Sequence, residues 1–450
     1  MNDQTRLPLA QEIAYAARSV GQVLAGHTLP VEPLSGSPAG GAHAKPGLIP
    51  ARSRAAIRDM AYRTVRELGL LQALLGRLNR KRPDTLVYAL QLVALQQLVA
   101  PLRDAHVVVD QAVSAARLMP ETRPAGGLIN AVLRRYLREH DALRLDVGKN
   151  PEARWNFPRW WIDQLKREYP GQWQQLLEIS DRPAPMTLRI NQARTTVDAY
   201  LAELADAGLA GQQIGPLAVR LERAVDVARL PGFEQGLVSV QDAGAQLAAS
   251  LLQTEPGQRV LDACAAPGGK TAHLLEQHPL RLLALDSDAS RLERVGENLR
   301  RLDLIGQAEL RVADASEPSQ WWDNEAFDRI LVDAPCTASG IVRRHPEIRW
   351  LRQRRDIETL AATQTKILAG LWPTLKPGGK LLYVTCSMFS AEGEGVTNRF
   401  LTAEPTARRV PLSGVLGPSG DAAPIAQLLP RHGEHLDHDG FFYALIEKLV

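Results

Sequence analysis

The sequence predicts a multidomain protein, in which an all-α leading domain and a small α+β domain precede a doubly wound α/β domain with a mostly parallel sheet. Three observations predict this fold class. The chain has 450 residues, more than one hydrophobic core usually holds. Its leading part carries apolar residues at helical spacing. From about residue 241 onward, near-continuous apolar runs alternate with helical stretches, as parallel strands and their covering helices do.

The composition is that of a globular protein. The 53 basic and 50 acidic residues leave a net charge of +3, so the charge alone does not indicate a nucleic-acid partner. The N-terminus lacks the basic and apolar regions of a secretory signal, and the longest apolar run, 86–102, is too short to span a bilayer. We expect a cytoplasmic protein with no membrane association. Three cysteines without CxxC spacing form no disulfide framework and indicate no metal site.

Residues 1–145 form the predicted helical domain. Leu86, Leu90 and Val93 share one helical face, and Asp84 is the predicted cap of that helix. Residues 33–50 are dense in Gly, Pro and Ser, which predicts a loop inserted between helices.

The stretch LINAVLRRYLRE, residues 128–139, is an amphipathic helix in this reading. We expect Leu128, Val132 and Leu133 to face the core and the three arginines to remain solvated. A charged helix surface and an RNA contact explain the arginines equally well.

Residues 146–240 are predicted to hold a linker and the small α+β domain. PMTLRINQ has the pattern of a strand, and TTVDAYLAELADAGL that of an amphipathic helix. LVSVQDAGAQLAASLL is predicted to be a turn that leads into a second helix.

Residues 241–450 form the predicted α/β domain. Its expected parallel strands are the apolar runs RVLDAC, RLLALD, QAELRVAD, DRILVDAP and GKLLYVTC.

The first of these runs continues into a tight turn and a helix, VLDACAAPGGKTAHLLE (260–276). Gly268 and Gly269 have no side chains to block a ligand, so the turn predicts a site for a nucleotide-like molecule. Gly269, Lys270 and Thr271 match the end of the phosphate-binding pattern GxxxxGK[ST], but Cys264 stands where its first glycine is required. The sequence therefore disfavours a phosphate-binding loop.

Two carboxylates end neighbouring strands. Asp286 closes the second strand, where a carboxylate can accept hydrogen bonds from both ribose hydroxyls, and Asp314 closes the third, where it could meet an adenine amino group. Either residue alone could be only a helix cap. Together with the turn they outline a nucleoside pocket.

Two of the three cysteines also follow strand ends. Cys336 comes just after the fourth strand and Cys386 ends the fifth, so both are expected to border one crevice at the carboxyl edge of the sheet. A buried cysteine is often only a small apolar residue, but these positions favour a ligand site. A thiolate beside a nucleoside-type cofactor suits covalent addition to carbon 6 of cytosine, which activates carbon 5 for methylation. The residue pattern does not decide which cysteine attacks.

At this point the sequence resembles a known family. The ordered motifs DACAAPGGKT, ALDSD, VADA, VDAPCTASG, YVTCS and DGFFYALI are similar to those of the RNA 5-methylcytosine methyltransferases of the Nol1/Nop2/Sun family. The similarity covers about residues 150–450. The leading domain, including LINAVLRR, resembles the RNA-binding antiterminator NusB.

The resemblance implies roles that the spacing does not give. It implies a Rossmann-like methyltransferase fold, S-adenosylmethionine as cofactor and 16S ribosomal RNA as partner, with cytosine 967 as target and a monomeric enzyme. Cys386 would be the nucleophile and Cys336 would assist product release, whereas DNA cytosine methyltransferases attack with the equivalent of Cys336. Asp333 would lie near the cytosine and Lys270 near the catalytic cysteine. The implied cofactor contacts are Cys264, Ala265, Ala266, Pro267, Gly268, Gly269, Lys270, Asp286, Asp314 and Asp333.

The segment RRHPEIRWLRQRR, residues 343–355, is a predicted RNA contact. Its six arginines, one histidine and one tryptophan would give phosphate contacts and a stacking surface beside Cys336. A solvated helix face is the alternative. Two other functions stay open at this stage: a noncatalytic RNA-binding assembly factor and an NTP-dependent RNA factor.

Overall fold

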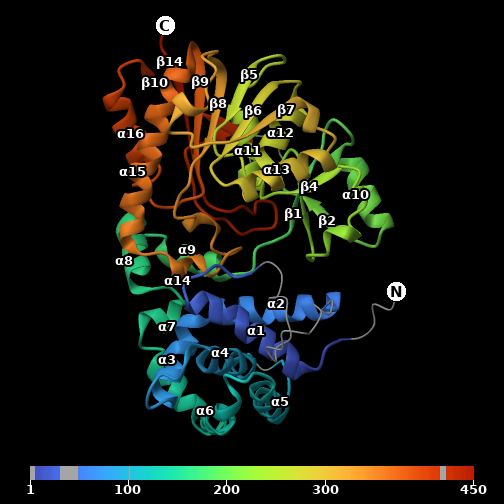
Figure 1. Ribbon diagram of the computed structural model, residues 1–450, viewed down its shortest axis with the longest axis vertical. Coiled ribbons are helices and arrows are strands. Elements are labelled where there is room, and N and C mark those ends of the chain that lie inside the picture. The colour runs from blue at the N-terminus through green and yellow to red at the C-terminus, as the bar shows by residue number, and fades with distance from the viewer. Residues whose placement is uncertain (1–5, 31–48, 101, 416–421) are drawn as a thin grey trace. The chain divides into compact units, whose positions relative to one another are not determined.

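The computed structural model describes residues 6–30, 49–100, 102–415 and 422–450 (Figure 1). The chain forms two compact units, the first made of residues 1–181 and 345–353, the second of residues 182–344 and 354–450. The predicted loop at 33–50 lies almost entirely outside the described residues. The predicted domain boundaries near 145 and 240 stay a prediction.

The first unit is a helical bundle built around a nearly fully buried helix, α4. Twelve of its fifteen residues are buried, because the helix is apolar on every face and its neighbours α1, α2, α3, α5 and α6 all contact it. The helices are α1 (Leu9–Leu24), α2 (Ala51–Arg66), α3 (Leu68–Leu78), α4 (Thr85–Val99), α5 (Ala105–Leu118), α6 (Gly126–Val147), α7 (Pro151–Trp155), α8 (Arg159–Glu168) and α9 (Trp173–Asp181).

Two local predictions about these helices are wrong. Asp84 does precede α4, but its side chain makes no capping hydrogen bond. Leu128 on α6 is 43% exposed, while Ile129 is fully buried beside Val132 and Leu133. The buried positions of α6 begin at Ile129 and recur at helical spacing, which leaves Leu128 at the edge of the apolar stripe.

Nine residues from the second half of the chain complete the first unit. They carry the short helix α14 (Ile348–Leu351), which Figure 1 shows beside α9. The buried Arg349 donates to Asp181 Oδ1 (2.7 Å) and to the carbonyl of Ser180 (2.8 Å), and it stacks 3.9 Å from the ring centroid of Phe157. Trp350 Nε1 donates to the carbonyl of Val65 at 2.9 Å. A segment remote in sequence therefore ties helix ends of this unit together.

Replacing Arg349 by Met should destabilise the first unit by about 2–4 kcal/mol, because two buried carbonyls and Asp181 lose their donor. Urea unfolding followed by tryptophan fluorescence measures the change. The matched control is Arg63→Met, which removes an exposed pair with Asp59 and should cost about 0.5 kcal/mol or less. Equal effects of the two substitutions would contradict the anchoring role.

The second unit begins with a four-stranded antiparallel sheet in the order β2-β3-β1-β4. Its elements are β1 (Thr187–Ile190), α10 (Val197–Asp206), β2 (Gly211–Gln213), β3 (Ala218–Leu221) and β4 (Val238–Val240). The predicted strand and helix are confirmed at β1 and α10. The stretch predicted as a turn before the second helix instead contains the strand β4, which pairs with β1. The helix α11 (Ala243–Leu251) follows it.

The larger sheet has the order β10-β14-β9-β8-β5-β6-β7, with β13 (Gln427–Leu428) paired to β14. All five predicted parallel strands are confirmed, and β14 and β10 add an antiparallel edge. The strands are β5 (Arg259–Asp262), β6 (Arg281–Asp286), β7 (Ala308–Val312), β8 (Phe327–Asp333), β9 (Leu375–Thr385), β10 (Ala407–Val410) and β14 (Phe441–Lys448). A separate pair, β11 (Ser413–Val415) and β12 (Ala422–Pro424), lies between β10 and β13 in the chain.

Helices cover both faces of this sheet, as the doubly wound class requires (Figure 1). One apolar core joins the strands to α11, α12 (Gly269–Gln277) and α13 (Ala289–Arg301). The other joins them to α15 (Arg354–Leu371) and α16 (Glu394–Ala403). The carboxyl ends of β5, β6, β8 and β9 consequently meet along one edge. Among the described residues, no helix combines the length and the apolar character that crossing a bilayer requires.

His273 on α12 is a buried base, 3% exposed, and its ring nitrogens meet no hydrogen-bond partner among the described residues. Burial, assisted by the charge of Arg189, lowers the pKa of His273 well below 6.5. The unfolded chain therefore binds a proton below about pH 6.5 that the folded chain does not bind, and stability falls as the pH drops through this range.

In a His273→Leu variant, this part of the pH dependence should disappear. Between pH 6.5 and pH 5, the free energy of unfolding of the variant should fall less steeply than that of the wild type, by up to about 1.4 kcal/mol per pH unit. Urea unfolding at a series of pH values measures the slopes. Parallel slopes would show that His273 is protonated in the folded protein.

Candidate active site

The turn after β5 exposes backbone at the carboxyl edge of the sheet. Gly268 has φ +96°, and a Cβ there would lie 3.1 Å from Val295, so conformation and space both require glycine. The Ala265 N–H donates to the carbonyl of Leu285 at 2.8 Å, which fixes the turn to β6. Cys264 faces the second apolar core, and burial raises the pKa of its thiol. Cys264 is therefore a neutral wall of the turn, with no charge to offer a ligand.

The carboxylates at the ends of β6 and β7 lie in different environments. Asp286 is 3% exposed and accepts from the N–H groups of Ala266 (3.2 Å) and Asp288 (3.1 Å), so it also braces the turn after β5. Asp314 is exposed and accepts from the N–H (2.8 Å) and hydroxyl (2.7 Å) of Ser316, which lowers its pKa. Asp314 thus stabilises the turn at residues 315–316 and does not cap a helix, because the next helical segment, Pro318–Gln320, has Glu317 as its N-cap; Asp314 stays ionised.

Lys270 forms an ion pair with Asp333 beside these carboxylates. Its Nζ lies 2.6 Å from Asp333 Oδ2. Burial alone would lower the pKa of Lys270, but Asp333, followed by Cys386 and Asp262, outweighs burial and raises it. Lys270 is therefore an ammonium ion near the sulfur atom of Cys386.

Asp262 is a site residue that the sequence reading did not single out. It ends β5 fully buried, accepts from the hydroxyl of Thr271 at 2.7 Å, and burial raises its pKa to about 7. The sequence did carry one sign of this residue, because Asp262 is a polar residue at the end of an otherwise apolar strand.

The two cysteines predicted to lie together at the carboxyl edge of the sheet are neighbours in the structure. The Sγ atoms of Cys336 and Cys386 are 3.3 Å apart. Cys336 is 7% exposed, and its hydrogen bond to Cys386, together with burial, raises its pKa well above 9.0. At neutral pH Cys336 is therefore a neutral thiol that can donate a hydrogen bond to its neighbour.

A buried glutamate lies behind both cysteines and was also missed. Glu392 is fully buried and accepts from the N–H of Thr337 (2.8 Å) and the hydroxyl of Ser387 (2.6 Å), the residues that follow the two cysteines. Its place in a short polar turn, SAEGEG, gave no sign of burial.

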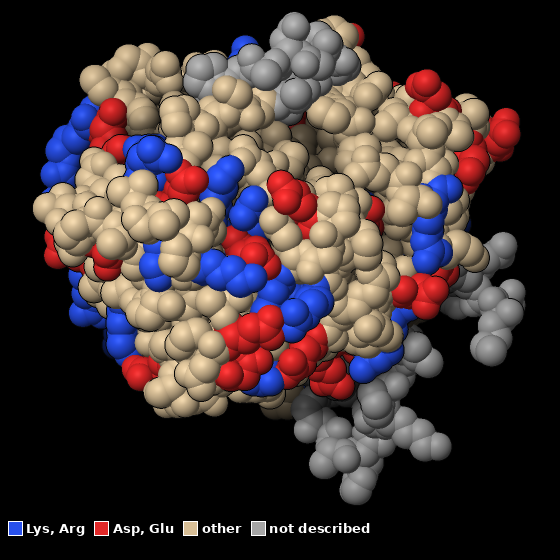
Figure 2. Space-filling model, turned by 90° about the horizontal axis from the view of Figure 1, so that it is seen from above, with Lys and Arg blue, Asp and Glu red and all other residues tan. Residues whose placement is uncertain are grey.

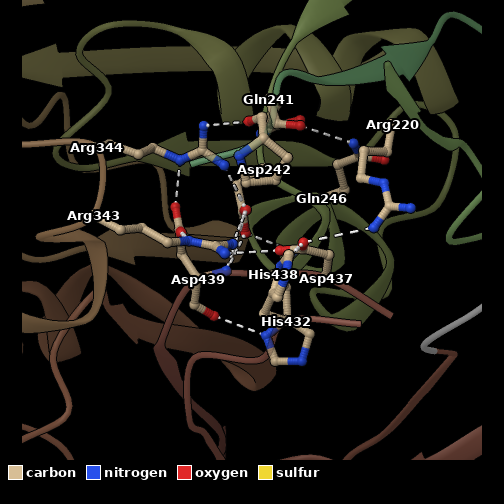
Figure 3. Close-up of polar contacts among 12 residues, drawn as sticks. Arg220, Gln241, Asp242, Gln246, Arg343, Arg344, His432, Asp437, His438 and Asp439 are labelled. Carbon is tan, nitrogen blue, oxygen red and sulfur yellow. Dashed lines mark hydrogen bonds and ion pairs between the residues drawn. The ribbon is translucent and has the colours of Figure 1, made fainter. Parts of the chain in front are cut away.

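The loop after Cys336 is held by a buried network of charges (Figure 3). The guanidinium groups of Arg343 and Arg344 both bind the fully buried Asp439. Arg343 also pairs with Asp437 at 2.8 Å, and Arg344 with Asp242 at 2.8 Å. These carboxylates come from the DGFF motif and its preceding loop, and from the start of α11, so the network joins distant parts of the second unit.

Close backbone packing reinforces this network. The Gly440 N–H donates to the carbonyl of Gly340 at 2.9 Å, and a Cβ on Gly340 would lie only 2.2 Å from Gly440 O. The Gly340 N–H in turn donates to the carbonyl of Cys386 at 2.9 Å. The two cysteine loops and the DGFF motif are thus built against one another.

Four of the eight residues predicted to contact RNA in the segment 343–355 are engaged elsewhere in the fold. Arg343, Arg344 and Arg349 are committed to ion pairs, and Trp350 packs against the core of the first unit. Arg354 and Arg355 are exposed. Arg343, Arg344 and Arg349 form ion pairs with carboxylates that are distant in sequence. A local sequence pattern does not reveal such pairs. Basic and acidic side chains are interspersed on the face that Figure 2 shows, so no single-sign field marks an RNA path there.

Comparison with known families matches each part of the chain. Residues 249–447 match the family described as 16S rRNA methyltransferase RsmB/F, residues 157–228 match an RsmF/B-like ferredoxin-like domain, and residues 16–138 match the NusB family. Ribosomal RNA small subunit methyltransferase B of Pseudomonas putida is 44% identical over 409 residues, 89% of this chain and 91% of that protein. The protein of the same name from Vibrio cholerae is 43% identical over 404 residues, 88% of this chain and 90% of that protein.

Fold, strand-end carboxylates and family matches together define the class of the protein, an S-adenosylmethionine-dependent methyltransferase. The chain belongs to the RsmB/F family of 16S rRNA methyltransferases, with a NusB-like leading domain. The predicted resemblance, fold class and cofactor are thereby confirmed.

Solved structures share the fold. The crystal structure of PH0851 matches with a TM-score of 0.76 at 23% identity, covering 99% of this chain and all of that one. A methyltransferase homologue from Pyrococcus horikoshii matches with a TM-score of 0.55 at 26% identity, over 66% of this chain and 97% of that one.

Proposed function

We propose that the protein methylates carbon 5 of a cytosine in 16S ribosomal RNA, through a covalent bond between Cys386 and carbon 6 of the base. The observation that carries the proposal is the pair of thiols 3.3 Å apart at the carboxyl edge of the sheet, beside the Lys270–Asp333 ion pair. Methylation at a ring nitrogen or a ribose oxygen needs no cysteine, whereas the unreactive carbon 5 of cytosine needs a nucleophile at carbon 6.

The electrostatics favour Cys386 over Cys336 as that nucleophile. The raised pKa of Cys336 keeps its proton, and a protonated Cys336 can donate a hydrogen bond that stabilises a thiolate on Cys386. The ammonium of Lys270 supplies positive charge to the same sulfur. Cys336 also has less access to a base, because it is buried and Cys386 is partly exposed.

The reaction then follows from these positions. The Cys386 thiolate adds to carbon 6, and the electron pair of the carbon 5–carbon 6 double bond becomes available at carbon 5. Bound S-adenosylmethionine supplies the methyl group that carbon 5 takes. A base removes the carbon 5 proton, the double bond re-forms and the bond to Cys386 breaks, and the hydrogen bond from Cys336 stabilises the departing sulfur.

The same geometry limits which cofactor contacts we propose. Backbone of residues 264–270 and the carboxylates of Asp286, Asp314 and Asp333 would hold the cofactor, and Asp333 would also lie near the cytosine. Asp286 fits the role of a ribose acceptor because it is fixed by two backbone donors.

Methyl transfer to RNA tests the proposal directly. The protein, radiolabelled S-adenosylmethionine and unmethylated 16S RNA should give 5-methylcytosine, identified after nuclease digestion by mass spectrometry, with cytosine 967 as the expected position. A methylated nucleoside other than 5-methylcytosine would refute the cysteine mechanism. The absence of any methyl transfer would favour the alternative, a noncatalytic assembly factor.

Three further expectations belong to the same proposal. We infer that the enzyme acts in the cytoplasm, that it works as a monomer, and that its target cytosine is unpaired or flipped out, since pairing and stacking hide carbon 6. The three-domain division at about residues 145 and 240 is proposed as the functional organisation, with the NusB-like part binding RNA.

A further inference from the structure

We infer that Glu392 is the positioning residue that holds Cys336 and Cys386 together for the reaction. This inference rests on the proposed function and deepens it. Glu392 lies just before α16 and does not touch either thiol in the contacts described above; it acts through the residue that follows each cysteine.

The carboxylate of Glu392 is surrounded by donors. Its Oε1 accepts from the Thr337 N–H (2.8 Å) and from Gln364 Nε2 (3.2 Å), and its Oε2 accepts from the hydroxyls of Thr337 and Ser387. Burial raises the pKa of Glu392, and the hydrogen bonds from Ser387, Thr337 and Gln364 oppose that effect. An ionised carboxylate only accepts hydrogen bonds, so this set of donors fits the charged form. Hydrogen bonds to a charged group are roughly twice as strong as neutral ones.

The hydroxyl of Ser387 donates its proton to Glu392 and has further hydrogen-bond partners. It accepts from the Phe389 N–H at 3.0 Å and lies 3.0 Å from Ser339 Oγ, which itself accepts from the Met388 N–H at 2.7 Å. The contact of 2.6 Å between Ser387 Oγ and Glu392 Oε2 directs the Ser387 proton to the carboxylate, and Ser339 then donates to Ser387 Oγ.

The partners of the Glu392 carboxylate come from both cysteine loops and from α15. Thr337 adjoins Cys336 and Ser387 adjoins Cys386, while Gln364 lies on α15 and also donates to the Pro335 carbonyl at 2.9 Å. Together with the Gly340–Cys386 backbone hydrogen bond, this carboxylate therefore sets the separation of the two loops, and with it the distance between the sulfur atoms. The charge of Glu392 lies behind the two cysteines, in a buried position that the target cytosine does not reach.

Glu392→Gln tests this inference, since it keeps the size of the side chain but removes the charge and places a donor among donors. The matched control is Glu394→Gln, because Glu394 lies two residues away and contacts Arg409 instead of the cysteine loops. Glu392→Asp keeps the charge at a shorter reach and should restore part of the lost function.

The first measurement needs neither RNA nor cofactor. Diamide takes up two electrons and two protons as two thiols join in a disulfide, and mass spectrometry of the peptide joining Cys336 to Cys386 gives the rate. The wild type and Glu394→Gln should form the disulfide at the same rate. Glu392→Gln should form it roughly 10-fold more slowly. Because no methyl transfer is involved, this result stands even if the proposed function fails.

The second measurement is steady-state methyl transfer to RNA over a range of RNA and cofactor concentrations. Glu392→Gln should lower kcat roughly 10- to 100-fold with KM values for RNA and cofactor within about 2-fold of the wild type, since binding surfaces are unchanged. Should Glu392→Gln fail to fold, Ser387→Ala removes one donor and leaves the carboxylate, and it should shift both rates in the same direction by a smaller factor. Wild-type rates in either measurement would overturn the inference.

Discussion

Replacing Cys386 by Ala should abolish methylation and the covalent complex with RNA. We expect turnover to fall by at least about 10⁴-fold, as it does when other enzymes lose their covalent nucleophile. An RNA that carries 5-fluorocytosine at the target traps the adduct, because the fluorine at carbon 5 cannot leave as a proton does. With the wild type, a complex that survives denaturing electrophoresis should form, and with Cys386→Ala it should not.

Cys336→Ala is the matched control, because it removes a thiol only 3.3 Å away. This variant should still form the complex and should accumulate it with ordinary RNA, since the departing Cys386 sulfur loses its hydrogen-bond donor. The opposite result, with adducts that depend on Cys336, would exchange the two roles and place the chemistry with that of the DNA enzymes.

Replacing Asp439 by Ala should destabilise the second unit by about 3–5 kcal/mol, a large share of the stability of a typical protein. Asp439 is fully buried and binds both Arg343 and Arg344 (Figure 3). Burial by itself would raise its pKa, but the two guanidinium groups outweigh burial and lower it. Without Asp439, the guanidinium groups of Arg343 and Arg344 each lose one carboxylate partner, which leaves part of their buried charge uncompensated.

The pair of Arg259 with the exposed Asp323 provides the comparison for this effect. Asp323 is 54% exposed, so Asp323→Ala should cost about 1 kcal/mol or less in urea unfolding. Asp439→Ala should also lower turnover, because the adjacent Gly440 holds Gly340 of the Cys336 loop. An Asp439 variant as stable as the Asp323 variant would show that the network contributes little net free energy.

The fold could be predicted largely because its strands are apolar on both faces. Runs such as RLLALD have one interpretation in a parallel sheet, and the turn after β5 follows from its glycines. The strand β4 was missed because VSV is three residues long and gains its identity only by pairing with β1. Leu128 was misplaced because two helical registers one residue apart fit the same pattern, and only packing selects Ile129.

The site could be predicted wherever a residue type is chemically distinctive at a strand end, as for the two cysteines and Asp286, whereas Asp333 came only from the family resemblance. Their roles in the reaction stay predictions. Glu392 and Asp262 were overlooked because burial, which makes a carboxylate unusual, is a tertiary property. The arginines at 343–349 were misread for the same reason: an arginine bound to a distant aspartate looks in sequence like one that awaits a phosphate.

The excursion of residues 345–353 has a consequence for how the gene product can be divided. A fragment that ends at residue 181 would lack Arg349 and Trp350, and a fragment that begins at residue 182 would carry a tryptophan without its carbonyl partner on Val65. Neither piece would be a finished module on its own. Supplied together, the two fragments should recognise each other through those nine residues, so a chain severed at this point is expected to reassemble.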